Sequence, residues 1–190
     1  MKANDILSLP NLLTLIRLLA IPVIARLIYV GEPYVLLAFV LFLCIWLTDM
    51  LDGYMARRLN QVTEFGKVFD PFVDKVFQLT VAITMYCIGK LPLWVPVVIA
   101  VKESFLMVGG LTLLKRSGAV IPARWYGKVA TILFVIAFAT LFFLPAEAYF
   151  LTDYIFIPPV LLSLFACVQY GISFLKIIKE HPQETAGNDS

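Results

Sequence analysis

Long apolar segments separated by short polar ones dominate this chain. The apolar segments cover residues 12–30, 34–57, 66–88, 92–114, 126–144 and 154–178. Each is close to the roughly 20 residues that a helix needs to cross the ~30 Å hydrocarbon core of a bilayer. Helices satisfy their own backbone hydrogen bonds in lipid, and the chain lacks the alternation typical of barrel strands. The pattern therefore predicts an all-α integral membrane protein, a bundle of six transmembrane helices.

The composition agrees with a membrane protein. Of 190 residues, 61% are hydrophobic and 15% are charged, and the mean hydropathy is +0.91. A net charge of +2 gives no indication of a nucleic-acid partner. Cys44, Cys87 and Cys167 lack the paired spacing of a metal or redox motif, so we expect them to be buried small hydrophobic residues. We expect one membrane domain over residues 1–178 and a polar cytoplasmic tail over residues 179–190.

Basic residues are unevenly distributed between the two ends of the predicted helices. With the N-terminus in the cytoplasm, that side carries Lys2, Arg57, Arg58, Lys67, Lys115, Arg116, Arg124, Lys128, Lys176 and Lys179. The opposite side keeps mainly Lys90. This asymmetry follows the positive-inside rule, so we expect a multi-pass protein of the cell (inner or plasma) membrane with both termini cytoplasmic. An acid and a proline precede the first apolar segment, so we expect no removable signal peptide.

Four aspartates stand in otherwise apolar segments. Asp49 and Asp52 lie near the end of the second segment, and Asp70 and Asp74 lie near the start of the third. A carboxylate within a membrane is costly, so its usual role is functional. At helical spacing each pair shares a face, and a helical hairpin would bring the four acids together. The alternative is that they form buried ion pairs that fix helix packing, with Arg57, Lys67 and Lys75.

Clustered carboxylates need a compensating charge, because like charges and desolvation both oppose their ionisation. Oxygen-only ligands suit hard cations such as Mg²⁺ or Mn²⁺, and Mg²⁺ commonly links carboxylates to substrate phosphates. Gly53, Ala56 and Gly66 lack bulk on the same helix faces, which would let a nucleotide or diphosphate approach the backbone. Arg57 would pair with its charge. The pattern therefore predicts a metal site for a phosphate-bearing substrate.

This segment resembles the signature of the class I CDP-alcohol phosphotransferase (phosphatidyltransferase) family, Asp-x2-Asp-Gly-x2-Ala-Arg-x8-Gly-x3-Asp-x3-Asp. All eight fixed positions match, namely Asp49, Asp52, Gly53, Ala56, Arg57, Gly66, Asp70 and Asp74. The N-terminal sequence PNLLTLIRLLAIP is also similar to the first span of one branch of the family. That branch contains phosphatidylglycerophosphate synthases and CMP-forming cardiolipin synthases.

The resemblance implies a six-helix bundle, usually a homodimer, with its active site facing the cytoplasm. It implies transfer of a phosphatidyl group from CDP-diacylglycerol to a glycerol-type acceptor, with release of CMP. Asp49, Asp52 and Asp70 would hold a two-metal Mg²⁺ or Mn²⁺ centre. Asp74 would lie at the metals as a further ligand and act as the catalytic base. The residues expected to bind CDP are Gly53, Ala56, Arg57 and Gly66.

Polar residues outside the signature are candidates for the acceptor site. Thr14 and Arg17 share a face of the first predicted helix, where Arg17 either binds a phosphate or closes a structural ion pair. Lys102 and Glu103 either lie near the acceptor or form a structural pair. Lys128, at the start of the fifth predicted helix, is the remaining acceptor-site candidate.

The acceptor itself stays open between glycerol 3-phosphate and phosphatidylglycerol. Resemblance along the whole chain favours glycerol 3-phosphate. However, Lys102 stands where synthases of phosphatidylglycerophosphate typically have an arginine, and Gly109 and Gly110 stand near a second one. A lysine lacks the bidentate fork of arginine, so the pocket would select less strongly for a phosphate monoester.

A simpler explanation is that the two glycines permit close helix packing and that another cation holds the phosphate, the candidates being Lys115, Arg124 and Lys128. A non-enzymatic membrane transporter or scaffold is the alternative from another class. A transporter is expected to show internal repeats, and the sequence has none.

Overall fold

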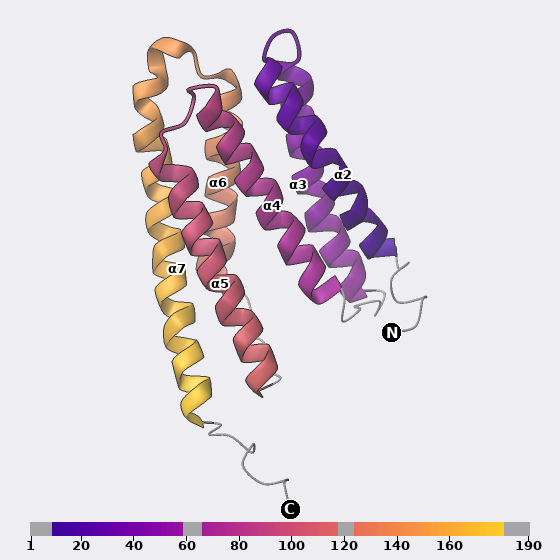
Figure 1. Cartoon of the computed structure of the whole chain (residues 1–190), viewed down its shortest axis with the longest axis vertical. Coiled ribbons are helices and arrows are strands. Elements are labelled where there is room, and N and C mark those ends of the chain that lie inside the picture. Colours follow the sequence, from indigo (N-terminus) through magenta and orange to yellow (C-terminus); the bar gives the residue numbers. More distant parts are fainter. Residues whose placement is uncertain (1–8, 59–65, 118–123, 181–190) are drawn as a thin grey trace, which may run out of the picture. The chain divides into compact units, whose positions relative to one another are not determined.

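Helices account for most of the structure, a computed structural model that describes residues 9–58, 66–117 and 124–180. In chain order they are α2 (Leu9–Val30), α3 (Val35–Arg58), α4 (Gly66–Cys87), α5 (Trp94–Ser117), α6 (Trp125–Phe143), the short 3-10 helix η1 (Ala146–Leu151) and α7 (Thr152–Glu180) (Figure 1). The described ranges contain no strand. The all-α prediction is confirmed, and each predicted segment corresponds to a helix with ends shifted by a few residues. Of the predicted tail, residues 179 and 180 end α7, and residues 181–190 lie outside the described residues.

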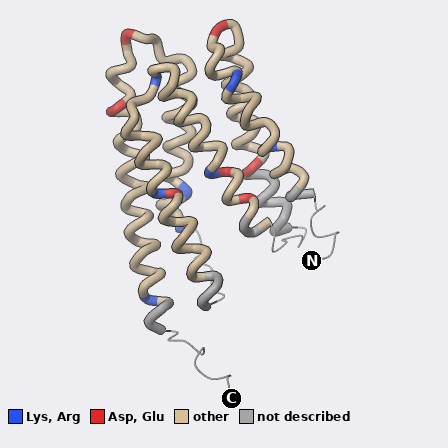
Figure 2. Tube along the Cα trace, viewed as in Figure 1, with Lys and Arg blue, Asp and Glu red and all other residues tan. Residues whose placement is uncertain are grey.

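Four helical stretches are long and apolar enough to cross a membrane within the described ranges. They are Leu12–Val30, Trp94–Leu113, Trp125–Phe143 and Ala146–Ile177, and Val35–Asp49 is a shorter apolar stretch. Charged positions are sparse along all of these helices (Figure 2). The chain is therefore a membrane protein, while the count of six spans stays a prediction.

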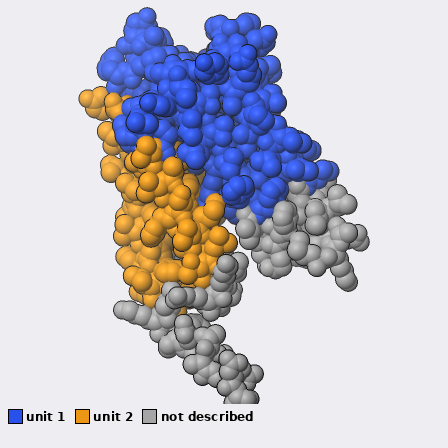
Figure 3. Space-filling view, in the orientation of Figure 1, with its two compact units in different colours: residues 1–96, 138–152 blue, residues 97–137, 153–190 orange. Residues whose placement is uncertain are grey.

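The chain folds into two compact units (Figure 3). The first contains residues 1–96 and 138–152, and the second contains residues 97–137 and 153–190. In the first unit, α2 packs against both α3 and α4. Gly31, with a φ of 73°, directly follows α2, and its N–H bonds to the carbonyl of Leu27 at 3.2 Å. A residue with a side chain adopts this left-handed conformation only with strain, so glycine allows the short turn into α3.

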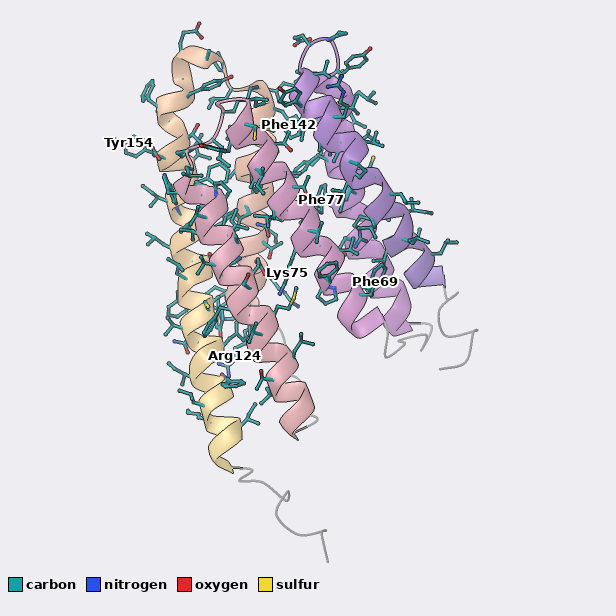
Figure 4. All side chains as sticks on the ribbon, viewed as in Figure 1. Phe69, Lys75, Phe77, Arg124, Phe142 and Tyr154 are labelled. Atoms are coloured by element: carbon teal, nitrogen blue, oxygen red, sulfur yellow. The ribbon has the colours of Figure 1, made fainter. Side chains whose placement is uncertain are left out.

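Aromatic side chains form much of the core of the first unit. Phe42 of α3 lies 5.8 Å from Phe77 of α4, 6.4 Å from Phe138 and 5.5 Å from Phe142, measured between ring centroids. All four are buried, and Phe77 and Phe142 are labelled in Figure 4. This cluster joins α3 and α4 to the end of α6, so it fixes two of the three helices that carry the site described below.

Lys90 joins the loop after α4 to the end of α6. Its Nζ donates hydrogen bonds to the carbonyl oxygens of Leu141 at 3.1 Å and Phe142 at 3.3 Å. These carbonyls belong to the last turn of α6, where no following helical N–H reaches them and where the helix dipole favours a cation. Burial lowers the pKa of the Lys90 ammonium, and the nearby Glu32 carboxylate partly offsets this effect.

The second unit contains most of α5, α6 and α7. The phenolic oxygen of Tyr170 accepts a hydrogen bond of 3.0 Å from the backbone N–H of Arg124, directly before α6. Its ring lies 6.0 Å from that of Tyr126. Phe134 of α6 and Phe156 of α7, both buried, lie 6.3 Å apart. These contacts fix α6 to α7.

The expectation that the cysteines are buried was wrong. Cys44 and Cys87 are exposed and Cys167 is partly exposed, and all three are free thiols. The expectation assumed the rule for soluble proteins, in which apolar residues lie inside. A helix surrounded by lipid also places apolar residues on its outer face, so an apolar neighbourhood does not predict burial here.

Candidate functional site

Three helices of the first unit bring their polar residues together. Thr14 and Arg17 lie one turn apart on α2, Asp49 lies in the second half of α3, and Asp70 and Asp74 lie one turn apart in the first half of α4. Helical spacing places each pair on one face. Because α2 packs against both other helices, its polar face reaches acids that the chain supplies from two separate segments.

Arg17 binds an acid from each neighbouring helix. Its Nη1 lies 2.8 Å from Oδ1 of Asp49 and donates a hydrogen bond of 2.6 Å to Oδ1 of Asp74. The Arg17 side chain is 2% exposed, whereas those of Asp49 and Asp74 are 34% and 38% exposed. The cation is therefore buried behind the two carboxylates, which remain accessible to a ligand.

Thr14 binds the third acid. Its hydroxyl, which is buried, donates a hydrogen bond of 2.7 Å to Oδ1 of Asp70. Thr14 and Arg17 therefore both donate hydrogen bonds from α2 to carboxylates at this place. Sequence reasoning placed Thr14 and Arg17 at an acceptor site and considered an ion pair for Arg17. It did not identify Asp49, Asp70 and Asp74 as their partners.

The remaining signature residues are described only in part. Gly66 is buried and begins α4. Asp52, Gly53, Ala56 and Arg57 belong to the helical backbone of α3, but their surroundings lie outside the described part of the structure. The side chain of Lys67, in α4, also lies outside the described part, so neither its predicted ion pair nor that of Arg57 is tested.

The chemistry of the donors fits a hard cation. Asp49 and Asp74 are partly exposed, and an oxygen atom of each contacts Nη1 of Arg17. Asp70 lies one turn before Asp74 on α4. Carboxylate oxygens are the ligands that hard cations prefer. Among the described side chains, no three acids, histidines or cysteines lie close enough together to hold one ion. Asp52, three residues after Asp49, is not among them. The acids that the structure describes therefore supply the right ligand type for part of a metal site.

The other acceptor-site candidates lie in the second unit. Lys102 forms an ion pair of 2.6 Å with Glu103, and its Nζ lies 5.2 Å from the ring centroid of Phe134. Both charged side chains are largely buried, which favours the structural-pair interpretation of Lys102. Lys128, in the first turn of α6, is exposed. A Cβ built on Gly109 or Gly110 would meet no described atom within 4 Å other than those of its chain neighbours and its own helix backbone, so helix packing within the described chain does not require either glycine.

Comparison with known proteins gives a consistent result. The family model described as CDP-alcohol phosphatidyltransferase matches residues 7–170. A Mycobacterium tuberculosis protein, provisionally named phosphatidylglycerophosphate synthase, is 36% identical over 144 residues, covering 74% of this chain and 68% of its own. The CDP-diacylglycerol--glycerol-3-phosphate 3-phosphatidyltransferase of Aquifex aeolicus is 38% identical over 128 residues, covering 66% and 70%.

A further relative carries a different name. A Mycobacterium bovis protein, provisionally named cardiolipin synthase, is 32% identical over 143 residues, covering 73% of this chain and 66% of its own. The matched region of the family model contains all three helices of the candidate site.

Proposed function

Since this chain belongs to the CDP-alcohol phosphatidyltransferase family, we propose that it transfers the phosphatidyl group of CDP-diacylglycerol to glycerol 3-phosphate and releases CMP. The name of the Aquifex aeolicus relative states a transfer between these two substrates. Membership of a family of transferases also favours an enzyme over the transporter or scaffold considered above. The proposed product is a phosphatidylglycerophosphate, and the proposed reaction is a step of phospholipid biosynthesis.

The contacts of three signature acids with one face of α2 carry the proposal. Asp49, Asp70 and Asp74 come from two helices and meet Thr14 and Arg17 of a third. Maintaining several carboxylates in a membrane protein is costly unless they bind something. Partly exposed acids on neighbouring helices suit a substrate that arrives with cations and carries a diphosphate.

The transfer requires one bond to form and one to break. The oxygen of an acceptor hydroxyl attacks the phosphatidyl phosphorus, and the bond from that phosphorus to the bridging oxygen of CMP breaks. CMP leaves with this oxygen, and the hydroxyl proton passes to the carboxylate of Asp74 acting as general base. Asp74 is suited to this role because it is partly exposed and is held in place by Arg17.

The remaining signature residues complete the proposed site. The four acids, Asp49, Asp52, Asp70 and Asp74, would hold Mg²⁺ or Mn²⁺. Bound cations would neutralise the diphosphate and the charge that develops on CMP. The CDP moiety would be surrounded by Gly53, Ala56, Arg57 and Gly66. We place the site on the cytoplasmic side of the cell membrane and expect a homodimer.

Phosphatidylglycerol is the second candidate acceptor, which would make the chain a CMP-forming cardiolipin synthase. One observation favours it. Apart from the neighbouring residues and the backbone of its own helix, a Cβ built at Gly109 or Gly110 meets no described atom within 4 Å, so packing within the described chain leaves both positions open to a bulky acceptor. Lys102, engaged with Glu103, is also a weak candidate for clamping a phosphate monoester.

The direct test is release of CMP by the purified protein in detergent. CDP-diacylglycerol and glycerol 3-phosphate are supplied with Mg²⁺ or Mn²⁺, and the lipid product is identified by mass spectrometry. Parallel reactions contain phosphatidylglycerol, inositol phosphate or serine. Metal-dependent CMP release with glycerol 3-phosphate supports the proposal. Release with only inositol phosphate or serine would contradict it.

A further inference from the structure

Arg17 supplies a positive charge between two acids of this site. Its Nη1 bonds to Oδ1 of both Asp49 and Asp74, two of the acids proposed to bind the divalent cation. A guanidinium stays protonated in proteins, so this charge is permanent. The same two carboxylates therefore bind an internal cation and are also the proposed ligands of an external one.

The difference in burial determines from which side Arg17 and a metal ion contact the carboxylates. Arg17 is 2% exposed and lies behind the carboxylates, which are 34% and 38% exposed. A metal ion from solution reaches the acids from the exposed side, while the guanidinium stays at the buried side. Two positive charges then share the same carboxylates at short distance in a poorly screened environment, which disfavours metal binding.

We propose that Arg17 is a built-in counter-ion that holds Asp49 and Asp74 together without metal and, by its charge, weakens the affinity of the site for divalent metal. The proposal rests on the metal site of the proposed function. It makes Arg17 a positioning residue, distinct from a ligand of the acceptor phosphate. It also explains how the acids of two helices remain adjacent when no metal compensates their repulsion.

Three substitutions separate the charge of Arg17 from its shape. Arg17→Lys keeps the positive charge, Arg17→Gln keeps an N–H donor without charge, and Arg17→Met keeps only the length. Arg26→Met is the matched control, because Arg26 is an exposed arginine on the same helix. The probe is Mn²⁺ alone, added to protein purified in detergent with chelator and then freed of it. One readout is the midpoint temperature of thermal unfolding. The other is the Mn²⁺ concentration at which the Mn²⁺-induced rise of this midpoint reaches half of its maximum.

We expect the neutral variants to have a lower midpoint than the wild type in chelator and a larger rise with Mn²⁺. Their half-saturating Mn²⁺ concentration should fall by about tenfold or more, since one unit charge at short range is removed. Arg17→Lys should stay within a few-fold of the wild type, and Arg26→Met should match it. If Arg17→Gln folds only with Mn²⁺ present, that result also supports the proposal, because it is a larger version of the expected dependence of stability on Mn²⁺.

Other outcomes would overturn the proposal. If the neutral variants lower the midpoint temperature equally with and without Mn²⁺, and the half-saturating Mn²⁺ concentration is unchanged, Arg17 forms a structural ion pair only. A higher half-saturating concentration would mean that Arg17 assists metal binding, and failure of both neutral variants to fold even with Mn²⁺ would mean the charge is required for the fold. Absence of any Mn²⁺ effect in the wild type would overturn the proposed metal site as well. Normal Mn²⁺ effects without CMP release would overturn the proposed function alone.

Discussion

The hydroxyl of Thr14 is bonded at 2.7 Å to Oδ1 of Asp70, a residue 56 positions later in the chain. Thr14 is 1% exposed, so water cannot replace this bond when it is lost. The contact orients one acid of the signature from a helix that contains no signature residue. α2 therefore supports the site without carrying the motif.

We predict that Thr14→Val impairs both stability and transfer, whereas Thr14→Ser retains most of each. Valine has the shape of threonine but no donor, and a hydrogen bond to a charged group contributes roughly 1.5–3 kcal/mol. The thermal midpoint and the rate of CMP release should therefore fall together in Thr14→Val. Equal behaviour of the valine and serine variants would show that the hydroxyl is unimportant.

Chelation is predicted to abolish CMP release. Clustered carboxylates repel a diphosphate unless cations neutralise it. Activity measured in excess EDTA should drop to background and return when Mg²⁺ or Mn²⁺ is added beyond the chelator. A zinc-selective chelator at equal concentration serves as the control. Full turnover in EDTA would overturn the metal assignment of Asp49, Asp52, Asp70 and Asp74.

Asp74→Asn is predicted to bind the CDP-lipid but lose transfer. An amide cannot accept the proton of the acceptor hydroxyl, and general-base catalysis contributes roughly 10²–10⁴ in rate. Binding of CDP-diacylglycerol and CMP release are measured on the same preparation. The exposed Asp153, in the first turn of α7, supplies the control Asp153→Asn. Turnover of Asp74→Asn at the wild-type rate would exclude Asp74 as the base.

Lys90→Met is predicted to destabilise the first unit without a direct effect on chemistry. The variant removes the donor to two carbonyls at the end of α6, each bond contributing about 1 kcal/mol. The thermal midpoint should fall, while the KM for both substrates stays unchanged. Lys176→Met, at an exposed lysine of α7, should leave the midpoint close to that of the wild type. A shifted KM at unchanged midpoint would place Lys90 at the substrate site.

The helices and the signature acids were predictable because their physical signals are local. An apolar stretch of sufficient length predicts a helix in lipid, and the spacing of Asp70 and Asp74 places them on one face without knowledge of the fold. The acids were also conspicuous because charge is costly in an apolar segment. These predictions needed no information on how the helices pack.

The partners of Arg17 were not predictable, because they depend on which helices are neighbours. The sequence showed a cation and a threonine one turn apart, which indicates a polar face but not what it meets. Only the packing of α2 against α3 and α4 places Arg17 between Asp49 and Asp74. The expectation that Cys44 is buried was wrong for a related reason, since hydropathy does not distinguish a lipid-facing position from a core position.

The last prediction concerns the choice of acceptor. Apart from the neighbouring residues and the backbone of α5, no described atom lies within 4 Å of a Cβ built at Gly109 or Gly110, and Lys102 is paired with Glu103. An open, weakly charged surface should select poorly for the phosphate monoester of glycerol 3-phosphate. We therefore expect phosphatidylglycerol to give detectable cardiolipin with CDP-diacylglycerol in mixed micelles, alongside the reaction with glycerol 3-phosphate.

Gly109→Arg should shift this preference toward glycerol 3-phosphate, because a guanidinium binds a phosphate bidentately and its bulk obstructs a second lipid. Gly109→Ala is the matched control, since it adds a methyl group where space is available and introduces no charge. The ratio of the two products in a competition assay should rise for arginine and stay near the wild-type value for alanine. If the wild type makes no cardiolipin and Gly109→Arg leaves the rate with glycerol 3-phosphate unchanged, this face of α5 does not contribute to acceptor selection. Recognition of the phosphate would then rest on other cations, among which the exposed Lys128 is the first to test.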